Sequence, residues 1–278
     1  MLPARGAVAP SVPFRPAFRL PALEAVLRRL RAAQGLLTGL LLLLAWEGAV
    51  RLLDVPAWTL PAPSRIATTM IERWDVLVAE AAVTATETLL GFLAGAVCGV
   101  ALALLMAAAP WLERSVNPVL VVSQAIPVMA LAPLLVVWMG FGMAPKIVMA
   151  GLVIFFPVAA NFHEGLRRTD PGLVDLGRLY GASPGRLLRL LRIPAALPLL
   201  ATGIRMAAAL APIGAVIGEY VGASAGLGLL MLHANARMQT DLVFAALAVL
   251  VVFTLALWAV VGWGTRRLVH WAPDTLAP

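Results

Sequence analysis

Between two long apolar stretches, residues 175–194 read Asp175-Leu176-Gly177-Arg178-Leu179-Tyr180-Gly181-Ala182-Ser183-Pro184 and then Gly185-Arg186-Leu187-Leu188-Arg189-Leu190-Leu191-Arg192-Ile193-Pro194. Asp170-Pro171-Gly172, just before them, predicts a turn, because proline fixes φ and the aspartate can accept a hydrogen bond from the following backbone. Residues 173–180 then suit a short helix. Gly181 ends that helix, since glycine tolerates the left-handed conformation that closes helices. Ser183 can cap a second helix with Pro184 at its first position, so the stretch predicts helix, glycine turn and helix.

The second predicted helix carries a basic stripe, and prolines follow it. Arg186, Arg189 and Arg192 recur every three residues along it. Pro194 and Pro198 then mark the start of the next apolar stretch. We expect these prolines to interrupt the helix before the chain continues into that stretch.

The composition is that of a membrane protein. Of 278 residues 62% are hydrophobic and 13% charged, and a soluble domain would carry roughly twice that charged share. Several apolar runs reach the roughly 20 residues that a bilayer-spanning helix needs. Backbone groups in lipid must bond internally, so the predicted class is all-α and polytopic. We predict about six transmembrane helices, near residues 36–53, 83–109, 118–140, 146–161, 196–221 and 242–264.

The chain divides into a short N-terminal region, 1–35, and a membrane region, 36–278. The first 21 residues contain five prolines and scattered arginines, which is typical of a disordered tail. Leu23, Val26, Leu27 and Leu30 follow at helical spacing opposite arginines. They predict a short amphipathic helix on the inner membrane surface.

The basic residues predict the orientation of the spans. With a cytoplasmic N-terminus, fifteen arginines fall in inner segments: Arg5, Arg15, Arg19, Arg28, Arg29, Arg31, Arg114, Arg167, Arg168, Arg178, Arg186, Arg189, Arg192, Arg266 and Arg267. Five basic residues fall in outer segments: Arg51, Arg65, Arg73, Lys146 and Arg237. Basic residues concentrate on the cytoplasmic side of membrane proteins. Both termini, and the loop near residues 162–195, are therefore expected in the cytoplasm.

The sequence lacks the signatures of an enzyme. Lys146, the only lysine, follows Pro145 and precedes Ile147, so the phosphate-binding pattern G-x4-G-K-[ST] is absent. No Ser/His/Asp or paired-carboxylate pattern stands out, and we predict no catalytic residue and no cofactor. The single cysteine, Cys98, lies in an apolar span, and no Cys/His cluster suggests a metal.

Polar residues inside apolar spans suggest a solute pathway, because charge within a bilayer is costly. Glu219 lies in the fifth span before a glycine-rich stretch, 222–228, that permits a re-entrant turn. Pro127 and Pro133 break up the third span, which is tolerated where backbone lines protein or water. The predicted pathway residues are Ser123, Gln124, Met129, Pro212 and Glu219. Glu87 lies near the outer start of the second span, and Arg205 within the fifth.

The loop resembles the "EAA" loop of bacterial ABC importer permeases, E-A-A-x3-G-x9-I-x-L-P, by which the membrane subunit binds its ATPase. Asp175 stands for the glutamate, Leu176-Gly177 for the two alanines, and Leu191-Arg192-Ile193-Pro194 for I-x-L-P. The spacing matches although these residue types depart from the pattern. The resemblance implies ATPase-coupling roles for Asp175, Leu176, Gly177, Gly181, Ala182, Ser183, Ile193 and Pro194.

This resemblance also implies a type I importer permease in the bacterial inner membrane. Its expected partners are ABC ATPase subunits, a periplasmic or lipid-anchored solute-binding protein and a second copy of itself, with no nucleic acid. A channel or secondary carrier would explain the hydropathy but not the loop. A membrane-embedded enzyme would need clustered intramembrane His, Asp or Ser.

The resemblance covers roughly residues 55–265 and is closest to nitrate, sulfonate and taurine permeases. Leu60-Pro61-Ala62-Pro63-Ser64, residues 132–142 and Phe155-Phe156-Pro157 look like that group. Residues 218–241 look more like its branch for the thiamine pyrimidine precursor. The expected solute is that precursor, with sulfonate, taurine or nitrate as alternatives.

Overall fold

The structure, a computed structural model, describes residues 21–271, and for residues 21–33 and 36 it describes the backbone alone. The proline-rich tail predicted before residue 21 lies outside these described residues. The chain divides into two units, Met1–Asp54 and Val55–Pro278. The first contains α1 (Pro21–Leu52), which is one continuous helix. The predicted surface helix and the predicted first span therefore belong to a single helix.

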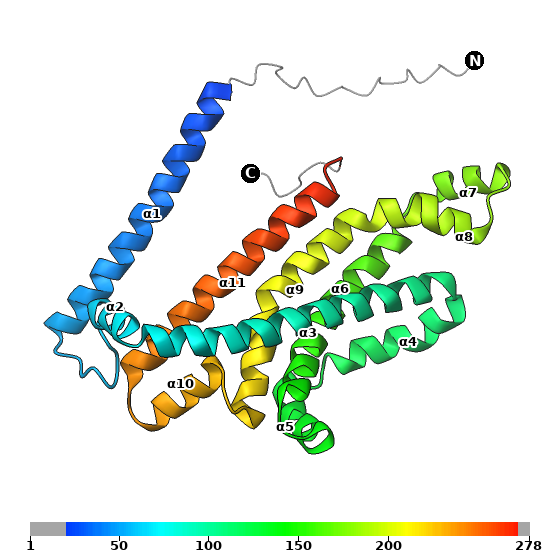
Figure 1. Ribbon diagram of the computed structural model, residues 1–278. Helices are drawn as coiled ribbons and strands as arrows, with labels where there is room; N and C mark the ends of the chain where they lie inside the picture. The colour runs from blue at the N-terminus through cyan, green and yellow to red at the C-terminus, as the bar shows by residue number, and fades with distance from the viewer. Residues whose placement is uncertain (1–20, 272–278) are drawn as a thin grey trace, which may run out of the picture. The chain divides into compact units, whose positions relative to one another are not determined.

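The second unit contains the other helices, and no strand occurs between residues 21 and 271. These helices are α2 (Pro63–Glu72), α3 (Trp74–Ala108), α4 (Pro110–Ser123), α5 (Val128–Met139), α6 (Met143–Arg167), α7 (Pro171–Leu179), α8 (Pro184–Leu187), a π-helical turn η1 (Leu188–Arg192), α9 (Ile193–Gly222), α10 (Leu227–Ala236) and α11 (Thr240–Leu268). Figure 1 shows their arrangement. The all-α prediction is confirmed.

Long apolar helices account for the predicted spans of the second unit. Within the described residues, α3, α6, the continuous helix Pro184–Gly222 and α11 are long and apolar enough to cross a membrane. The pair α4 and α5 adds a fifth span if both helices count as one. The predicted first span falls on α1, which is not among these candidates.

The third span is broken where the sequence predicted. The axes of α4 and α5 differ by 103°, and Pro127 is the N-cap residue of α5. Proline lacks the N–H that would continue the helix, so the chain turns at residues 124–127. Pro133 lies inside α5 without ending it.

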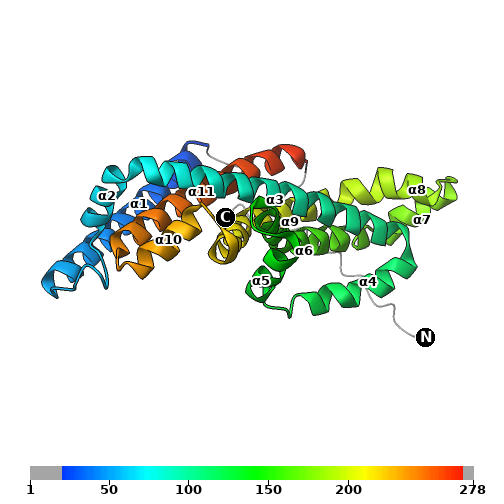
Figure 2. The ribbon, with the colours of Figure 1, turned by 60° about the horizontal axis from the view of Figure 1, so that its bottom comes forward.

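Glycine lets the central helices approach closely. α6 packs between α3 and α9, and its Ile154, Val158 and Phe162 belong to the core. A Cβ placed on Gly95 of α3 would lie 2.5 Å from the carbonyl oxygen of Gly151 on α6. Small residues four apart are a common device for helix contact in membranes. Gly91, Gly95 and Gly99 thus form the α3 side of this contact, where Figure 2 shows α3 crossing α6 and α9.

The entrance to the fifth span differs from the prediction. Pro194 and Pro198 do not interrupt the helix, because α8, η1 and α9 run on without a break. Pro194 cannot donate a backbone hydrogen bond and would crowd the preceding turn of an α-helix. The π-helical turn at Leu188–Arg192 widens the helix directly before it. A π-turn of this kind is one way a helix adjusts locally without ending.

Candidate functional site

The predicted loop folds as two helices around a glycine turn. Asp170 is the N-cap of α7, and its Oδ1 accepts a hydrogen bond from the backbone N–H of Gly172 at 2.7 Å. This bond satisfies one of the free donors at a helix start. The predicted turn at Asp170-Pro171-Gly172 is therefore confirmed.

Gly181 ends the first helix with a φ of +74°, in the left-handed region. Its N–H donates to the carbonyl of Arg178, and the N–H of Ala182 donates to that of Gly177. Both bonds use carbonyls that a helix end leaves free. The turn thus needs a residue that accepts positive φ, as the sequence indicated.

Ser183 begins the second helix. Its Oγ accepts from the backbone N–H of Arg186, with Pro184 at the first helical position. Gly177 lets the two helices of the loop touch, because a Cβ there would lie 2.5 Å from Cδ2 of Leu187. Leu187 and Val174 are buried. The two helices therefore pack as one unit.

One side of α7 is apolar and uncovered. We call it the exposed α7 face: Leu173, Leu176, Leu179 and Tyr180. Leu179 is 85% exposed and Tyr180 84% exposed. Asp175 is also exposed and pairs with Arg178 at 3.0 Å. Contiguous exposed apolar patches are typical of interaction sites, and this face is a candidate for one.

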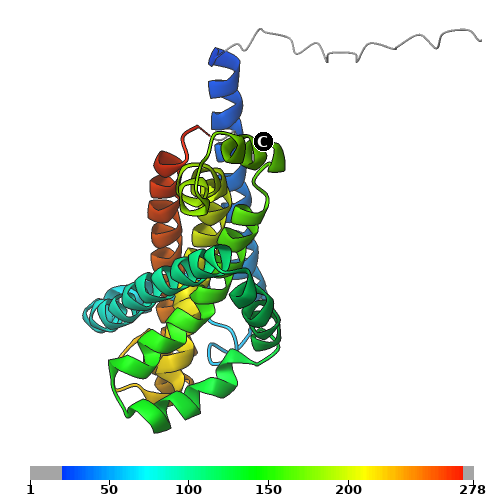
Figure 3. The same cartoon turned by 90° about the vertical axis from the view of Figure 1, so that its right-hand side faces the viewer.

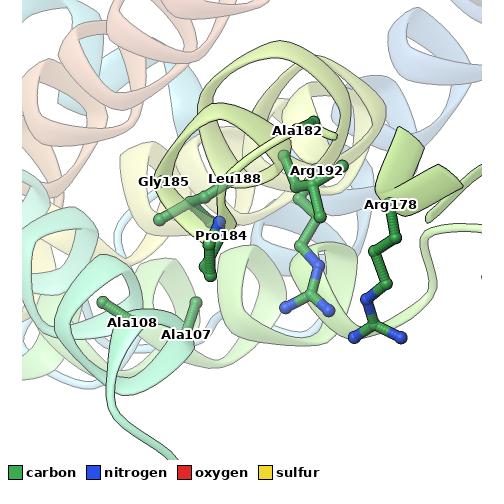
Figure 4. A pocket seen from close by; sticks show the side chains of 9 residues that line it. Ala107, Ala108, Arg178, Ala182, Pro184, Gly185, Leu188 and Arg192 are labelled. Atoms are coloured by element: carbon green, nitrogen blue, oxygen red, sulfur yellow. The ribbon is translucent and has the colours of Figure 1, made fainter. Parts of the chain in front are cut away.

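A pocket of about 260 Å³ lies between this loop and the end of α3. Ala107 and Ala108 come from α3, while Arg178, Ala182 and Arg192 come from the loop and the helix after it. Figure 4 shows the side chains of Arg178 and Arg192 extending toward the same side of this pocket. Arg178 is already paired with Asp175, so Arg192 supplies the further positive charge, which suits a carboxylate or phosphate.

The structure separates the eight predicted coupling residues into groups. Asp175 and Leu176 lie on exposed positions of α7, whereas Gly177, Gly181 and Ser183 shape its turn. Ala182 lines the pocket. Ile193 and Pro194 begin α9, where they are half-buried.

The predicted pathway residues also fall into two groups. Ser123, Gln124 and Met129 are exposed at the bend between α4 and α5. Pro212 is buried and Glu219 is fully buried in α9. Within one subunit, only the first group is accessible.

Sequence reasoning missed the role of Lys146, which it counted as an outer surface charge. Its side chain is 3% exposed, and its Nζ lies 2.7 Å from Oε1 of Glu87. The two residues are 59 positions apart, so no local pattern pairs them. The one available signal was that Lys146 is the only lysine in an arginine-rich chain.

The ends of the second unit differ in character. Figure 3 shows α7 and α8 at one end, and α5 with the last turns of α9 at the other. The exposed loop and the buried ion pair therefore lie toward opposite ends of α6. The two ends of the unit therefore differ: one carries an exposed apolar loop and the other a buried polar cluster.

Comparison with known proteins gives the family. Residues 91–271 match the binding-protein-dependent transport system inner membrane component. A probable ABC transporter permease of Haemophilus influenzae is 45% identical over 87% of this chain and 98% of its own.

Other relatives have assigned solutes. The riboflavin transport system permease RibX of Chloroflexus aurantiacus is 37% identical, covering 84% of this chain and 88% of its own. The formylaminopyrimidine transport permease ThiX of Halalkalibacterium halodurans is 34% identical, covering 86% and 94%.

A solved structure supports the fold. An inward-facing MetNI methionine ABC transporter matches with a TM-score of 0.61 and 21% identity, covering 72% of this chain and 97% of that one. The chain therefore belongs to the binding-protein-dependent transport system inner membrane components: it is a multi-pass permease subunit of an ABC importer for small solutes, not an enzyme.

Proposed function

We propose that this permease works as a homodimer with cytoplasmic termini and imports the pyrimidine precursor of thiamine. The solute assignment rests on the resemblance of residues 218–241 to the thiamine-precursor branch, together with the 34% identity to the formylaminopyrimidine permease over 94% of that protein. The ATPase and a solute-binding protein are the partners that the family requires.

The arginine distribution supports the orientation. In the orientation that the sequence predicts, fifteen arginines fall in segments assigned to the inner side, against five basic residues in segments assigned to the outer side. Lys146, one of these five, is buried in an ion pair rather than exposed in an outer loop. Without Lys146 the sequence count is fifteen against four, which favours cytoplasmic termini.

The exposed α7 face supports docking on the ATPase. Three of its four apolar side chains lie on α7, a helix of nine residues that packs against α8, and the fourth belongs to the C-cap residue Tyr180. Such a helix can insert its apolar face into a groove of a partner. The neighbouring pocket, with Arg178 and Arg192, suits an acidic side chain of the same partner.

The relatives favour a planar nitrogen heterocycle as the solute. The two relatives with assigned solutes and identities of 34% and 37% carry a pyrimidine and a flavin. A sulfonate permease of Bacillus subtilis is 30% identical. Riboflavin is thus the second candidate solute, and an aliphatic sulfonate or taurine is more distant.

Uptake into proteoliposomes tests the solute assignment. The permease is reconstituted with its ATPase and its binding protein, and labelled formylaminopyrimidine, riboflavin and taurine are compared. We expect ATP-dependent uptake of the pyrimidine alone. Uptake of riboflavin or taurine in its place would overturn the assignment, and ATP-independent uptake would overturn the importer mechanism.

The mass of the intact complex tests the stoichiometry. Native mass spectrometry of the detergent-solubilised complex should give two copies of this chain with two ATPase subunits. A complex with one copy of this chain and a different permease would replace the homodimer with a heterodimer.

A further inference from the structure

The start of α10 is capped by side chains from other helices. Its N-cap residue, Gly226, has no side chain with which to bond the free N–H groups. Glu80 accepts from the N–H of Gly226, and Thr84 Oγ1 accepts from the N–H of Leu227 at 2.8 Å. Glu219 Oε2 accepts from the N–H of Gly228 at 2.5 Å. Two carboxylates at a helix N-terminus are also favoured by the helix dipole.

These capping groups are linked to one another and to the ion pair. The Thr84 hydroxyl donates to Glu219 Oε1 at 2.6 Å. Glu80, Thr84 and Glu87 lie at i, i+4 and i+7, so they share one face of α3. Glu87 bonds Lys146 on α6, and the backbone of Lys146 lies against Gly218, next to Glu219 on α9. We call this set the α10 tether: Glu80, Thr84, Glu87, Lys146 and Glu219.

The tether leaves room only for glycine at two neighbouring positions, Gly226 and Gly228. A Cβ on Gly226 would collide with the carboxylate of Glu219, and one on Gly228 would lie 2.6 Å from its Oε2. The glycine-rich stretch that suggested a re-entrant turn is therefore the space in which Glu219 reaches the start of α10. A Cβ on Gly222, the last residue of α9, would likewise lie 2.6 Å from Cγ2 of Val136 on α5.

The tether is an expensive arrangement for a membrane core. Glu87, Thr84 and Glu219 are fully buried, and Lys146 is 3% exposed. Two buried carboxylates thus face one ammonium group, and Oε2 of Glu87 and Oγ1 of Thr88 have no hydrogen-bond partner among the described residues. Apolar residues of the same volume would pack at lower cost. Ionisable residues inside a membrane are by default functional.

We propose that the α10 tether is a set of positioning residues that holds α10 closed at the end of the subunit opposite the α7 loop, and releases it during transport. The inference rests on the proposed function, because it takes that end as the outer one. Lys146 lies 21 positions before Arg167 on α6, on the order of 30 Å along the helix. α5, which follows the bend in the third span, touches the same turn at Gly222.

Glu219→Gln separates tethering from general stability. Glutamine has the same shape and removes one of the two carboxylate charges that face Lys146, so the buried charge is better balanced. It also replaces one acceptor oxygen with an NH₂ group, so the side chain can no longer accept from both Thr84 and Gly228, and the charge-assisted bond to the Gly228 N–H is lost. If the Glu219 charge affects only the stability of the fold, Glu219→Gln should have equal or higher thermal stability and α10 should stay closed. A tether predicts opening without loss of stability.

The reporter is a cysteine at Ala234, which is 2% exposed on α10, in a Cys98→Ala background. A second reporter at Ala208, fully buried in the middle of α9, follows the core. In full-length permease in membrane vesicles, Glu219→Gln should raise the labelling rate at position 234 by about tenfold or more, as expected for a lost charge-assisted hydrogen bond. Labelling at position 208 should not change. Glu72→Gln, the same substitution at an exposed carboxylate of α2, should change neither rate.

The second arm uses the whole complex. With ATP trapped on the partner ATPase, position 234 of the otherwise unchanged subunit should also become reactive. The proposal is overturned if position 234 stays inert in Glu219→Gln or in every nucleotide state. It is equally overturned if positions 234 and 208 become reactive together, since the network would then stabilise the whole subunit. The first arm needs neither ATPase nor solute, so a failure of ATP-driven uptake would count against the proposed function alone.

Discussion

Individual residues of the α7 loop behave as local chemistry dictates. Asp170 and Ser183 each accept a hydrogen bond from the start of the helix that follows, and Gly181 takes the positive φ that closes α7. These features depend on neighbours two or three positions away, which is why the sequence alone predicted them.

Gly181→Val should uncouple ATP hydrolysis from uptake. A β-branched residue at a φ of +74° costs about 1–2 kcal/mol. Nothing lies within 4 Å of a Cβ at this position, so strain rather than collision is responsible. The measurement is solute uptake per ATP hydrolysed in proteoliposomes.

Gly264→Val is the matched control, because a Cβ at Gly264, on α11 and away from the loop, also meets open space and its φ is not positive. It should couple normally. Full coupling by Gly181→Val would show that the turn does not set the geometry of the loop.

Among the elements, glycine contacts decide how closely α3, α6 and α9 pack. Apolar periodicity placed the spans, yet it could not show which faces meet. The contact runs along Gly91, Gly95 and Gly99 of α3 and reaches the backbone of α6. A methyl group there would therefore separate two helices.

Gly95→Ala should lower the free energy of unfolding by about 1–3 kcal/mol, the usual range for overpacking. Its Cβ would meet the backbone of Gly151, which cannot move aside as a flexible side chain can. The apparent melting temperature in detergent measures the effect. Gly264→Ala, on an exposed position of α11 with no atom within 4 Å of its Cβ, should be neutral or stabilising.

Substitutions on the exposed α7 face should weaken ATPase binding without affecting the fold. We expect Leu179→Ser and Tyr180→Ser each to reduce affinity for the ATPase by about tenfold, as for central interface residues. Stability should change by less than about 0.5 kcal/mol, since both side chains are exposed. Copurified ATPase is quantified after washing.

Leu190→Ser serves as the comparison, because Leu190 is exposed in η1 and not on α7. Its copurification should be unchanged. Equal losses from positions 179, 180 and 190 would move the docking surface away from the α7 face.

For the whole permease, the arrangement of helices redistributes the predicted pathway. Ser123, Gln124 and Met129 are accessible at the bend of α4 and α5, and Glu219 instead belongs to the α10 tether. We retain the first three as proposed pathway residues. Met129 is 56% exposed in the single chain, so its side chain can line a pathway that a second copy of the chain completes.

In a Cys98→Ala background, cysteines at Gln124 and Met129 should react with a small polar thiol reagent in the resting complex. A cysteine at Pro212 should remain inert there, because that position is buried within the subunit. Trapping ATP on the partner should change the rates at positions 124 and 129. Inert cysteines at both positions in every state would place the pathway elsewhere.

The sequence by itself determined the class, the approximate spans and the conformation of the α7 loop. Apolar runs, turn residues and helix caps depend on interactions among a few neighbouring positions, so the sequence alone is enough to predict them. The same local view failed at Pro194, where a π-helical turn lets the helix continue.

Only the tertiary structure decided which buried polar groups meet. Lys146 and Glu87 are 59 positions apart, and Thr84 and Glu219 are 135 apart. In the sequence, Lys146 looked like an outer surface charge and Glu87 and Glu219 like separate polar residues of two spans, while Thr84 carried no signal. Their pairing depends on three helices crossing at glycine contacts, and no local pattern specifies where two helices cross. These buried groups bond to one another because a charge left unpaired in that core would have a large desolvation cost.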